Sequence, residues 1–280
     1  MTWTQIANQP WMLWRRQVAA ILRLELKKTL FSKRAWWIYL LTLGPVFITG
    51  MHSLFARGGH HTMGEDQMIF AGIFQVYFLR LGIFFGCLGI FSNLFRAEVL
   101  ERTLHYYFMA PVRREVLTVS KYLAGVLAAV IYFSGSVALS FLFISAHWGP
   151  VFQQYLAHGG GLAQLGWYAL TAALACVGYG SVFLLSGIVI RNPLIPAAVV
   201  FVWENLNPFL PSLLKKFSII FYLKSLCPAG DTADGPLAFL ASTAEPTPAW
   251  LAITGLLIVS ALVLAYAAAR SRQLEVSYSE

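Results

Sequence analysis

Charged residues are scarce in this chain: Asp, Glu, Lys and Arg make up 11% of its 280 residues, against about a quarter in soluble domains. Hydrophobic residues account for 58%, and the mean hydropathy is +0.66. A membrane-spanning helix needs about 20 mostly apolar residues, so the length allows several spans and no large soluble domain. The composition therefore excludes a soluble globular protein and predicts an all-α integral membrane protein.

Cysteines and recognised catalytic motifs are also few. Cys87, Cys176 and Cys227 have no metal-type spacing, which argues against a disulfide framework or a cysteine metal site. The sequence contains no G-x-x-x-x-G-K-[ST], G-x-S-x-G or H-E-x-x-H segment, which disfavours an embedded ATPase or hydrolase. His52, His60 and His61 match no recognised ligand pattern. We interpret them as part of a polar turn in preference to a metal site.

The N-terminal region begins without the apolar core and small-residue cleavage site of a signal peptide, so we expect it to stay in the mature chain. Residues 11–34 interleave large apolar side chains with seven Lys and Arg residues. This pattern predicts a basic amphipathic helix in the membrane interface. A solvated basic leader before the first span is the alternative.

Six apolar segments are predicted as membrane spans. They cover residues 36–55, 68–95, 122–146, 165–190, 194–207 and 249–269. The fifth is short for a full crossing and stops at Pro208. Residues 208–248 follow it, and we expect them to form short re-entrant amphipathic helices and a loop on the external side.

The basic residues decide the orientation of these spans. Most of the 20 Lys and Arg residues fall on the side of the two termini and of residues 96–121, whereas the other side receives Arg57, Lys215, Lys216 and Lys224. Cytoplasmic loops carry such an excess of Lys and Arg. We therefore expect both termini and residues 96–121 in the cytoplasm. The formal net charge of +8 is then explained without a nucleic-acid partner.

Residues 96–121 form a charged island between two apolar runs. The island contains Glu98, Glu101 and Arg102, then Thr103-Leu104, the run MAPVRRE over residues 109–115, and Lys121. This order resembles the cytoplasmic loop of ABC-2 type exporter permeases, the membrane subunits of type V ATP-binding-cassette exporters. The resemblance extends to the interfacial helix, the six spans and the re-entrant helices.

The resemblance implies that a coupling helix in this loop docks on a cytoplasmic ABC ATPase subunit. The chain would be a transport subunit and no enzyme, without a cofactor of its own, while the partner ATPase binds ATP and Mg. It would work in the cytoplasmic (inner) membrane of a prokaryote, among membrane lipids, with a second permease copy in a homodimer or, as the alternative, a heterodimer. The residues that we expect at the ATPase contact are Glu98, Glu101, Arg102, Leu104, Tyr107, Arg113 and Arg114, which combine a polar rim with apolar anchors.

Other interpretations remain open at this stage. The aromatic side chains of the loop would otherwise lie in lipid, with its charges solvated. A channel or secondary transporter that couples to no ATPase is the alternative function, and inverted repeats would favour it. We find no convincing repeat, because the two three-span halves have unlike connecting loops. The cargo does not follow from the composition.

Two charges lie deep in the predicted spans. Arg80 is about 18 Å inside the second span and Glu204 about 15 Å inside the fifth, at 1.5 Å per residue. Charges at such depth are costly unless they are paired or face water. We hypothesise a salt bridge between them, within a subunit or across a dimer. The alternatives are a place on the cargo pathway, or no contact at all.

Overall fold

The computed structural model describes residues 11–31, 36–55, 62–100, 109, 112–190, 192–228 and 247–273. The regular secondary structure in these ranges is entirely helical. Five helical stretches are long and apolar enough to cross a membrane: Trp36–Phe55, Met63–Glu98, Arg114–Trp148, Gly161–Val189 and Ala249–Ser271. The prediction of an all-α, multi-pass membrane protein is thus confirmed.

The predicted fifth span is the exception to the six-span count. It corresponds to α10 (Leu194–Leu206), which has 13 residues. At 1.5 Å per residue α10 is about 20 Å long, whereas the hydrocarbon core of a bilayer is about 30 Å thick. The described chain therefore has five long spans and one short apolar helix.

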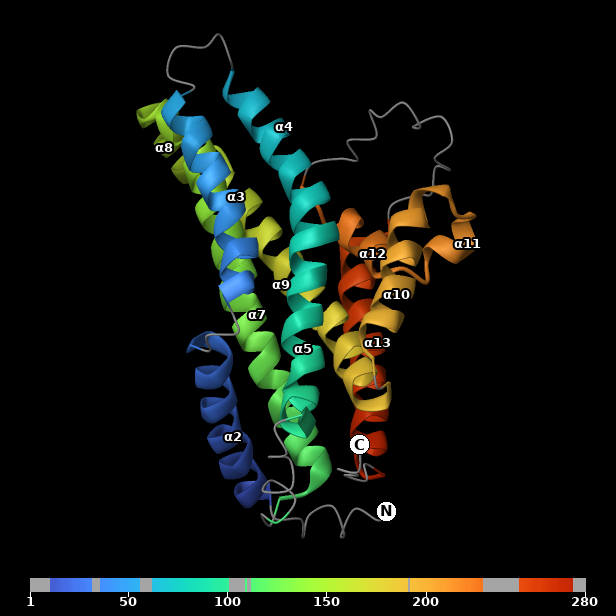
Figure 1. The fold of residues 1–280 in the computed structure, drawn as a ribbon. Coiled ribbons are helices and arrows are strands. Elements are labelled where there is room, and N and C mark those ends of the chain that lie inside the picture. Colours follow the sequence, from blue (N-terminus) through green and yellow to red (C-terminus); the bar gives the residue numbers. More distant parts are fainter. Residues whose placement is uncertain are drawn as a thin grey trace.

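The long helices run side by side in an elongated bundle (Figure 1). They are α3 (Trp36–Phe55), α5 (Ile83–Leu100), α7 (Arg114–Ile144), α9 (Gly161–Val189) and α13 (Ala249–Ser271). Helix α9 contacts α5, α7 and α13, and it is the most buried of the spans. Helix α9 is therefore the centre of the bundle.

Two further helices mark the ends of the bundle (Figure 1). Helix α2 (Trp11–Phe31) packs along α7 at one end, which we call the α2 end. Helix α4 (Met63–Ile73) lies at the opposite end, which we call the α4 end. A capping box starts α4, because the Thr62 side chain accepts from the Glu65 N–H and the Glu65 carboxylate accepts from the Thr62 N–H.

The second span is longer than predicted and changes its helix type. It runs through α4, the π-helix η3 (Phe74–Gly82) and α5. A π-helix has wider turns than an α-helix and often marks a functional site. Arg80 lies on this π-helical segment.

The predicted loops are partly helical. Helix α5 continues to Leu100 and α7 begins at Arg114, so residues 101–113 separate the two helices in the charged island. The loop after the third span contains η4 (Ala146–Trp148) and α8 (Pro150–His158). Gly149 and Gly160 flank α8 with φ of 52° and 84°, a region that favours glycine.

The region between α10 and α13 contains short helices where the sequence predicts re-entrant ones. They are η5 (Asn207–Phe209), α11 (Ser212–Lys215) and α12 (Ile219–Ser225). Helix α12 contacts α9, α13 and η3. This region is therefore packed onto the bundle through α12.

Glycines allow two close helix contacts to α5. A Cβ atom at Gly86 would lie 2.0 Å from the ring of Phe133 on α7, and one at Gly89 would lie 1.8 Å from the ring of Trp37 on α3. The absence of a side chain at Gly86 and Gly89 therefore lets α7 and α3 approach α5 closely. Gly82 instead faces Tyr77 of its own helical segment.

Replacing Gly86 with alanine should destabilise the fold. Phe133 is fully buried and has no room to move away, so we expect the free energy of unfolding to fall by about 1–3 kcal/mol through overpacking. Titration with SDS in mixed micelles measures this quantity. Gly135→Ala on α7 is the matched control, because a Cβ there meets nothing within 4 Å. Equal effects of the two substitutions would contradict this account of the packing.

Candidate functional site

A buried group of charges joins three helices at the α2 end. We call it the Lys121 cluster, and it consists of Glu25 on α2, Glu98 on α5 and Lys121 on α7. The Lys121 Nζ donates to Glu25 Oε1 at 2.8 Å, to Glu98 Oε1 at 2.6 Å and to the Leu94 carbonyl at 2.9 Å. The three charged side chains are at most 2% exposed. These acceptors match the three N–H donors of a lysine ammonium.

The cluster is close to electrically balanced. Two buried carboxylates face one buried ammonium, and a second cation comes from Lys28, whose Nζ lies 3.6 Å from Glu98 Oε1. The Lys121 Nζ also lies 5.4 Å from the centroid of the Phe95 ring. Charges removed from water are tolerated only when they are paired and hydrogen-bonded. The arrangement therefore holds α2, α5 and α7 in one relative position.

The cluster lies at the base of the charged island. Its members on α5 and α7 come just before and just after residues 101–113, and α2 lies along α7. The shared ammonium therefore connects α2, α5 and α7 near the two ends of that segment. The geometry thus suits the transmission of a movement from the island to the bundle.

The first residues of α7 make further contacts at the α2 end. The guanidinium carbon of Arg113 lies 4.8 Å from the ring centroid of Trp14 on α2. Arg114 Nη1 donates to the Arg272 carbonyl at 2.8 Å, and Glu115 forms an ion pair with Arg272 just after α13. The start of α7 therefore lies at the junction of α2 and α13.

The structure places only some of the predicted coupling residues. Arg113 is exposed and Arg114 is half-buried at the junction just described. Glu98 is 1% exposed, so its carboxylate does not lie on the polar rim that the sequence suggested. Four others, Glu101, Arg102, Leu104 and Tyr107, lie outside the described residues.

Sequence reasoning missed Glu25 altogether. It is the only acidic residue between Trp11 and Arg34, and a single acid on a strongly basic helix was the available signal. Its partner Lys121 is 96 residues away along the chain.

Glu204 occupies a different position from the one predicted. Its carboxylate accepts hydrogen bonds from the Ser218 hydroxyl at 2.6 Å and from the backbone N–H groups of Ile219 and Ile220 at 3.0 and 2.9 Å. These N–H groups belong to the first turn of α12, where they have no partners within the helix. A carboxylate also interacts favourably with the positive end of a helix dipole. Glu204 therefore holds α12 to α10.

Arg80 has no such partner. In the described part of the chain it forms no ion pair, and its buried Nε has no hydrogen-bond acceptor. The salt bridge with Glu204 is thus not formed within the chain, although Tyr179 on α9 interacts electrostatically with both groups. Arg80 lies on the π-helix η3, whose wider turns alter the direction of its side chains, and the start of α12 binds the Glu204 carboxylate. A pair across a dimer and a place on the cargo pathway both stay predictions.

The histidine region at the α4 end is organised around a buried aspartate. Asp66 accepts from Trp148 Nε1 at 2.8 Å, and its carboxylate lies 3.1 Å from His52 Nε2 and 3.4 Å from His147 Nε2. Among the described residues, no group of three or more metal-ligating side chains is placed to hold an ion. His60 and His61 lie outside them. Asp66 instead connects α3, α4 and η4.

The Lys121 cluster predicts a large difference between two lysines. Lys121→Met leaves two buried carboxylates without their ammonium, so we expect a loss of about 3–5 kcal/mol in the free energy of unfolding. Lys28→Met removes an ion pair whose lysine is 45% exposed, and we expect a loss of at most about 1 kcal/mol. SDS titration of both variants in mixed micelles makes the comparison. Similar losses would show that the buried cluster does not hold the helices together.

The two intramembrane charges predict effects of opposite sign. Arg80→Leu removes an unpaired cation, and we expect a gain in the free energy of unfolding of about 2–3 kcal/mol. Glu204→Leu leaves the Ser218 hydroxyl and two N–H groups without an acceptor, and we expect a loss of a few kcal/mol. The same micelle titration measures both. A loss on Arg80→Leu, seen in the dimer and absent in the monomer, would instead show a salt bridge between subunits.

Comparison with known proteins identifies a family for this chain. A family model described as ABC-2 family transporter protein matches residues 21–207. The match spans the Lys121 cluster, Arg80 and Glu204. No curated protein matches the chain. The matched region covers well over half of the sequence, and the chain therefore belongs to the ABC-2 family of membrane transport proteins.

Proposed function

We propose that this chain is the permease subunit of an ATP-driven ABC exporter, with ATP hydrolysed by a separate ATPase subunit. The observation that carries the proposal is the Lys121 cluster, which links both flanks of residues 101–113 to the interfacial helix α2. A subunit driven by a partner must receive a force at one place and distribute it over several helices. The cluster supplies this connection at the base of the proposed coupling segment.

The proposal places the α2 end in the cytoplasm. Helix α2, the charged island and the end of α13 gather there, and they carry most of the Lys and Arg residues of the chain. An excess of basic residues is typical of the cytoplasmic side. An ATPase in the cytoplasm then meets residues 101–113, which agrees with the expected docking place.

The side chains around this segment fit a mixed apolar and polar contact. Met109 is 70% exposed, and Arg113, four residues later, is also exposed. Methionine and arginine are enriched in protein interfaces. Glu98 would contribute to the ATPase contact indirectly, because its hydrogen bond with Lys121 positions the end of α5. The residues after α5 would contact the ATPase directly. The partner ATPase would bind ATP and Mg, and this chain contributes no catalytic group.

Dimer formation and cargo movement belong to the same proposal. A second permease copy, identical or paralogous, would complete the pathway through the inner membrane of a prokaryote. Arg80, with an unpaired guanidinium at mid-span on a π-helix, is the group that we assign to the pathway or to the seam between copies. The short helices α11 and α12 would re-enter the membrane from the external side, anchored to α10 by Glu204.

The alternative is a channel or secondary transporter that couples to no ATPase. Such a protein would not need a buried connection between an interfacial helix and the flanks of one charged segment. Membership of the ABC-2 family also favours the exporter.

Copurification tests the proposed coupling. The tagged chain is purified from membranes of its own host, and the ATPase is identified by mass spectrometry through its nucleotide-binding motifs. We expect the double substitution Arg113→Glu and Arg114→Glu to reduce the recovered ATPase at least tenfold, through charge reversal at the contact. Arg270→Glu is the control, because Arg270 is an exposed arginine on α13 at the same end.

Each outcome of this test is informative. Recovery of the ATPase with wild type and Arg270→Glu, and its loss with the double variant, supports the placement of the contact. Equal recovery with the double variant would move the contact away from the start of α7. If wild-type protein that transports cargo carries no ATPase, the exporter proposal fails and the uncoupled transporter takes its place.

A further inference from the structure

A pocket opens between three segments at the α2 half of the bundle. It has a volume of about 690 Å³ and lies between Trp37 of α3, the face of α5 from Phe85 to Arg96, and residues 192–194 before and at the start of α10. Binding sites for small organic molecules have volumes of about 300–1,000 Å³. The pocket is therefore large enough for the polar head and the first carbons of an amphiphile.

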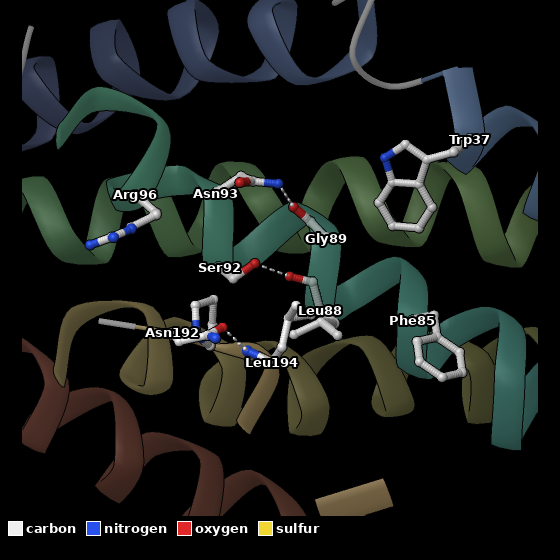
Figure 2. Close-up of a pocket in the computed structure, with 10 residues that line it drawn as sticks. Trp37, Phe85, Leu88, Gly89, Ser92, Asn93, Arg96, Asn192 and Leu194 are labelled. Atoms are coloured by element: carbon white, nitrogen blue, oxygen red, sulfur yellow. Dashed lines mark hydrogen bonds between the residues drawn. The ribbon is translucent and has the colours of Figure 1, made fainter. Parts of the chain in front are cut away.

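The wall of this pocket changes from apolar to polar along α5. Figure 2 shows Trp37 and Phe85 at one end of the pocket, and Arg96, Asn93 and Asn192 toward the other. Phe85 and Arg96 are separated by about 16 Å along the helix, at 1.5 Å per residue. The ring of Trp37 packs closely against Gly89 and lines the apolar end. Such a gradient matches a molecule with an apolar tail and a polar head.

The polar end lies near the end of the second candidate span. That span ends at Glu98 by length and composition, so Arg96 is about half a turn before its limit. The side chain of Asn93 donates to the Gly89 carbonyl at 2.7 Å, and that of Asn192 accepts from the Leu194 N–H at 3.2 Å. Asn93 and Asn192 are both exposed, which leaves their other amide atoms accessible to a ligand.

Arg96 is an uncompensated cation within the described chain. No hydrogen bond or ion pair of its side chain occurs there, and it is only half-buried. The described carboxylates at the α2 end are already engaged: Glu25 and Glu98 with Lys121, and Glu115 with Arg272. The guanidinium therefore presents its donors to the pocket region without a counter-charge from these groups.

We propose that this pocket binds an anionic phospholipid from the leaflet at the α2 end, with the phosphate at Arg96 and an acyl chain between Trp37 and Phe85. Basic pockets between membrane helices on the cytoplasmic side bind anionic headgroups, and a guanidinium matches a phosphate by two parallel hydrogen bonds. A second copy of this chain is a poorer occupant, because its α2 end would bring further positive charge. The inference rests on the pocket and its charge, and it holds whether or not an ATPase couples to the chain.

Lipid retention in nanodiscs tests the site. The full chain is reconstituted in bilayers of dioleoylphosphatidylcholine with a minor share of dioleoylphosphatidylglycerol, and the bound lipids are counted by native mass spectrometry after release. We expect Arg96→Gln to weaken phosphatidylglycerol binding about fivefold, the effect of one basic residue near a membrane surface. Arg96→Lys should keep most of the binding. Arg23→Gln is the matched control, an exposed arginine on α2 outside the pocket.

The results separate the proposed site from its alternatives. Binding that falls equally with Arg96→Gln and Arg23→Gln would show general attraction to a basic surface and overturn the site. Equal retention of phosphatidylcholine and phosphatidylglycerol by wild type would also overturn it. Displacement of the lipid by millimolar inorganic phosphate would show that the site recognises a free anion, and it would overturn the assignment to a phospholipid.

Two further measurements test whether the effect of Arg96→Gln comes from a lost dimer contact or from misfolding. A dimer fraction that falls with Arg96→Gln at constant lipid binding would assign the pocket to a seam between copies and reject the lipid. Unfolding by SDS confirms that each variant is folded, and Asn192→Leu supplies a second probe of the polar end. We expect Asn192→Leu to weaken phosphatidylglycerol binding without any change in charge, and unchanged binding by both Asn192→Leu and Arg96→Gln would place the lipid elsewhere.

Discussion

The buried ammonium of Lys121 is the constraint on which the α2 end of this protein depends. An ammonium without exposure to water needs acceptors for its three protons, and they come from α2 and α5. The helices that bring Glu25, Glu98 and Leu94 to one point are therefore fixed relative to α7. An apolar cluster would tolerate sliding of one helix past another, since dispersion contacts have little directionality. Charge pairing with defined donors and acceptors does not, and it makes these helices move as one unit.

In the other half of the second span, the directions of the side chains depend on a different constraint, the geometry of the π-helix η3. A π-helical segment wraps more residues into each turn than an α-helix does, so side chains after η3 point in directions that a uniform α-helix would not give. Arg80 lies on this segment without an ion pair in the described chain. Glu204 meanwhile satisfies three donors at the start of α12. The sequence predicts similar depths for the two charges, yet depth alone does not determine which groups meet.

The sequence was sufficient for features that depend on local composition. Apolar runs located the helices, and the first span was predicted with the bounds that α3 has. The motif also brought Glu98 and Lys121 to attention, but as surface and span-opening residues. The contact of Lys121 with Glu25 could not be predicted, because the two residues are 96 positions apart and no local sequence pattern connects them. The short apolar run of the fifth segment already indicated that α10 is too short to cross a membrane. Nothing in the sequence indicated the π-helix η3.

One physical cause connects orientation, coupling and lipid binding in the proposed function. At the α2 end the described carboxylates pair with Lys121, Arg272 and Lys28, and none of these pairs involves Arg96 or Arg113. What remains facing outward is the basic face of α2, Arg113 and Arg96. In the proposed function, a positive surface of this kind would retain the α2 end on the cytoplasmic side, attract an acidic protein surface to the charged island, and bind anionic headgroups at Arg96. The internal pairing of Glu25, Glu98 and Glu115 thus leaves the described surface of the α2 end positively charged.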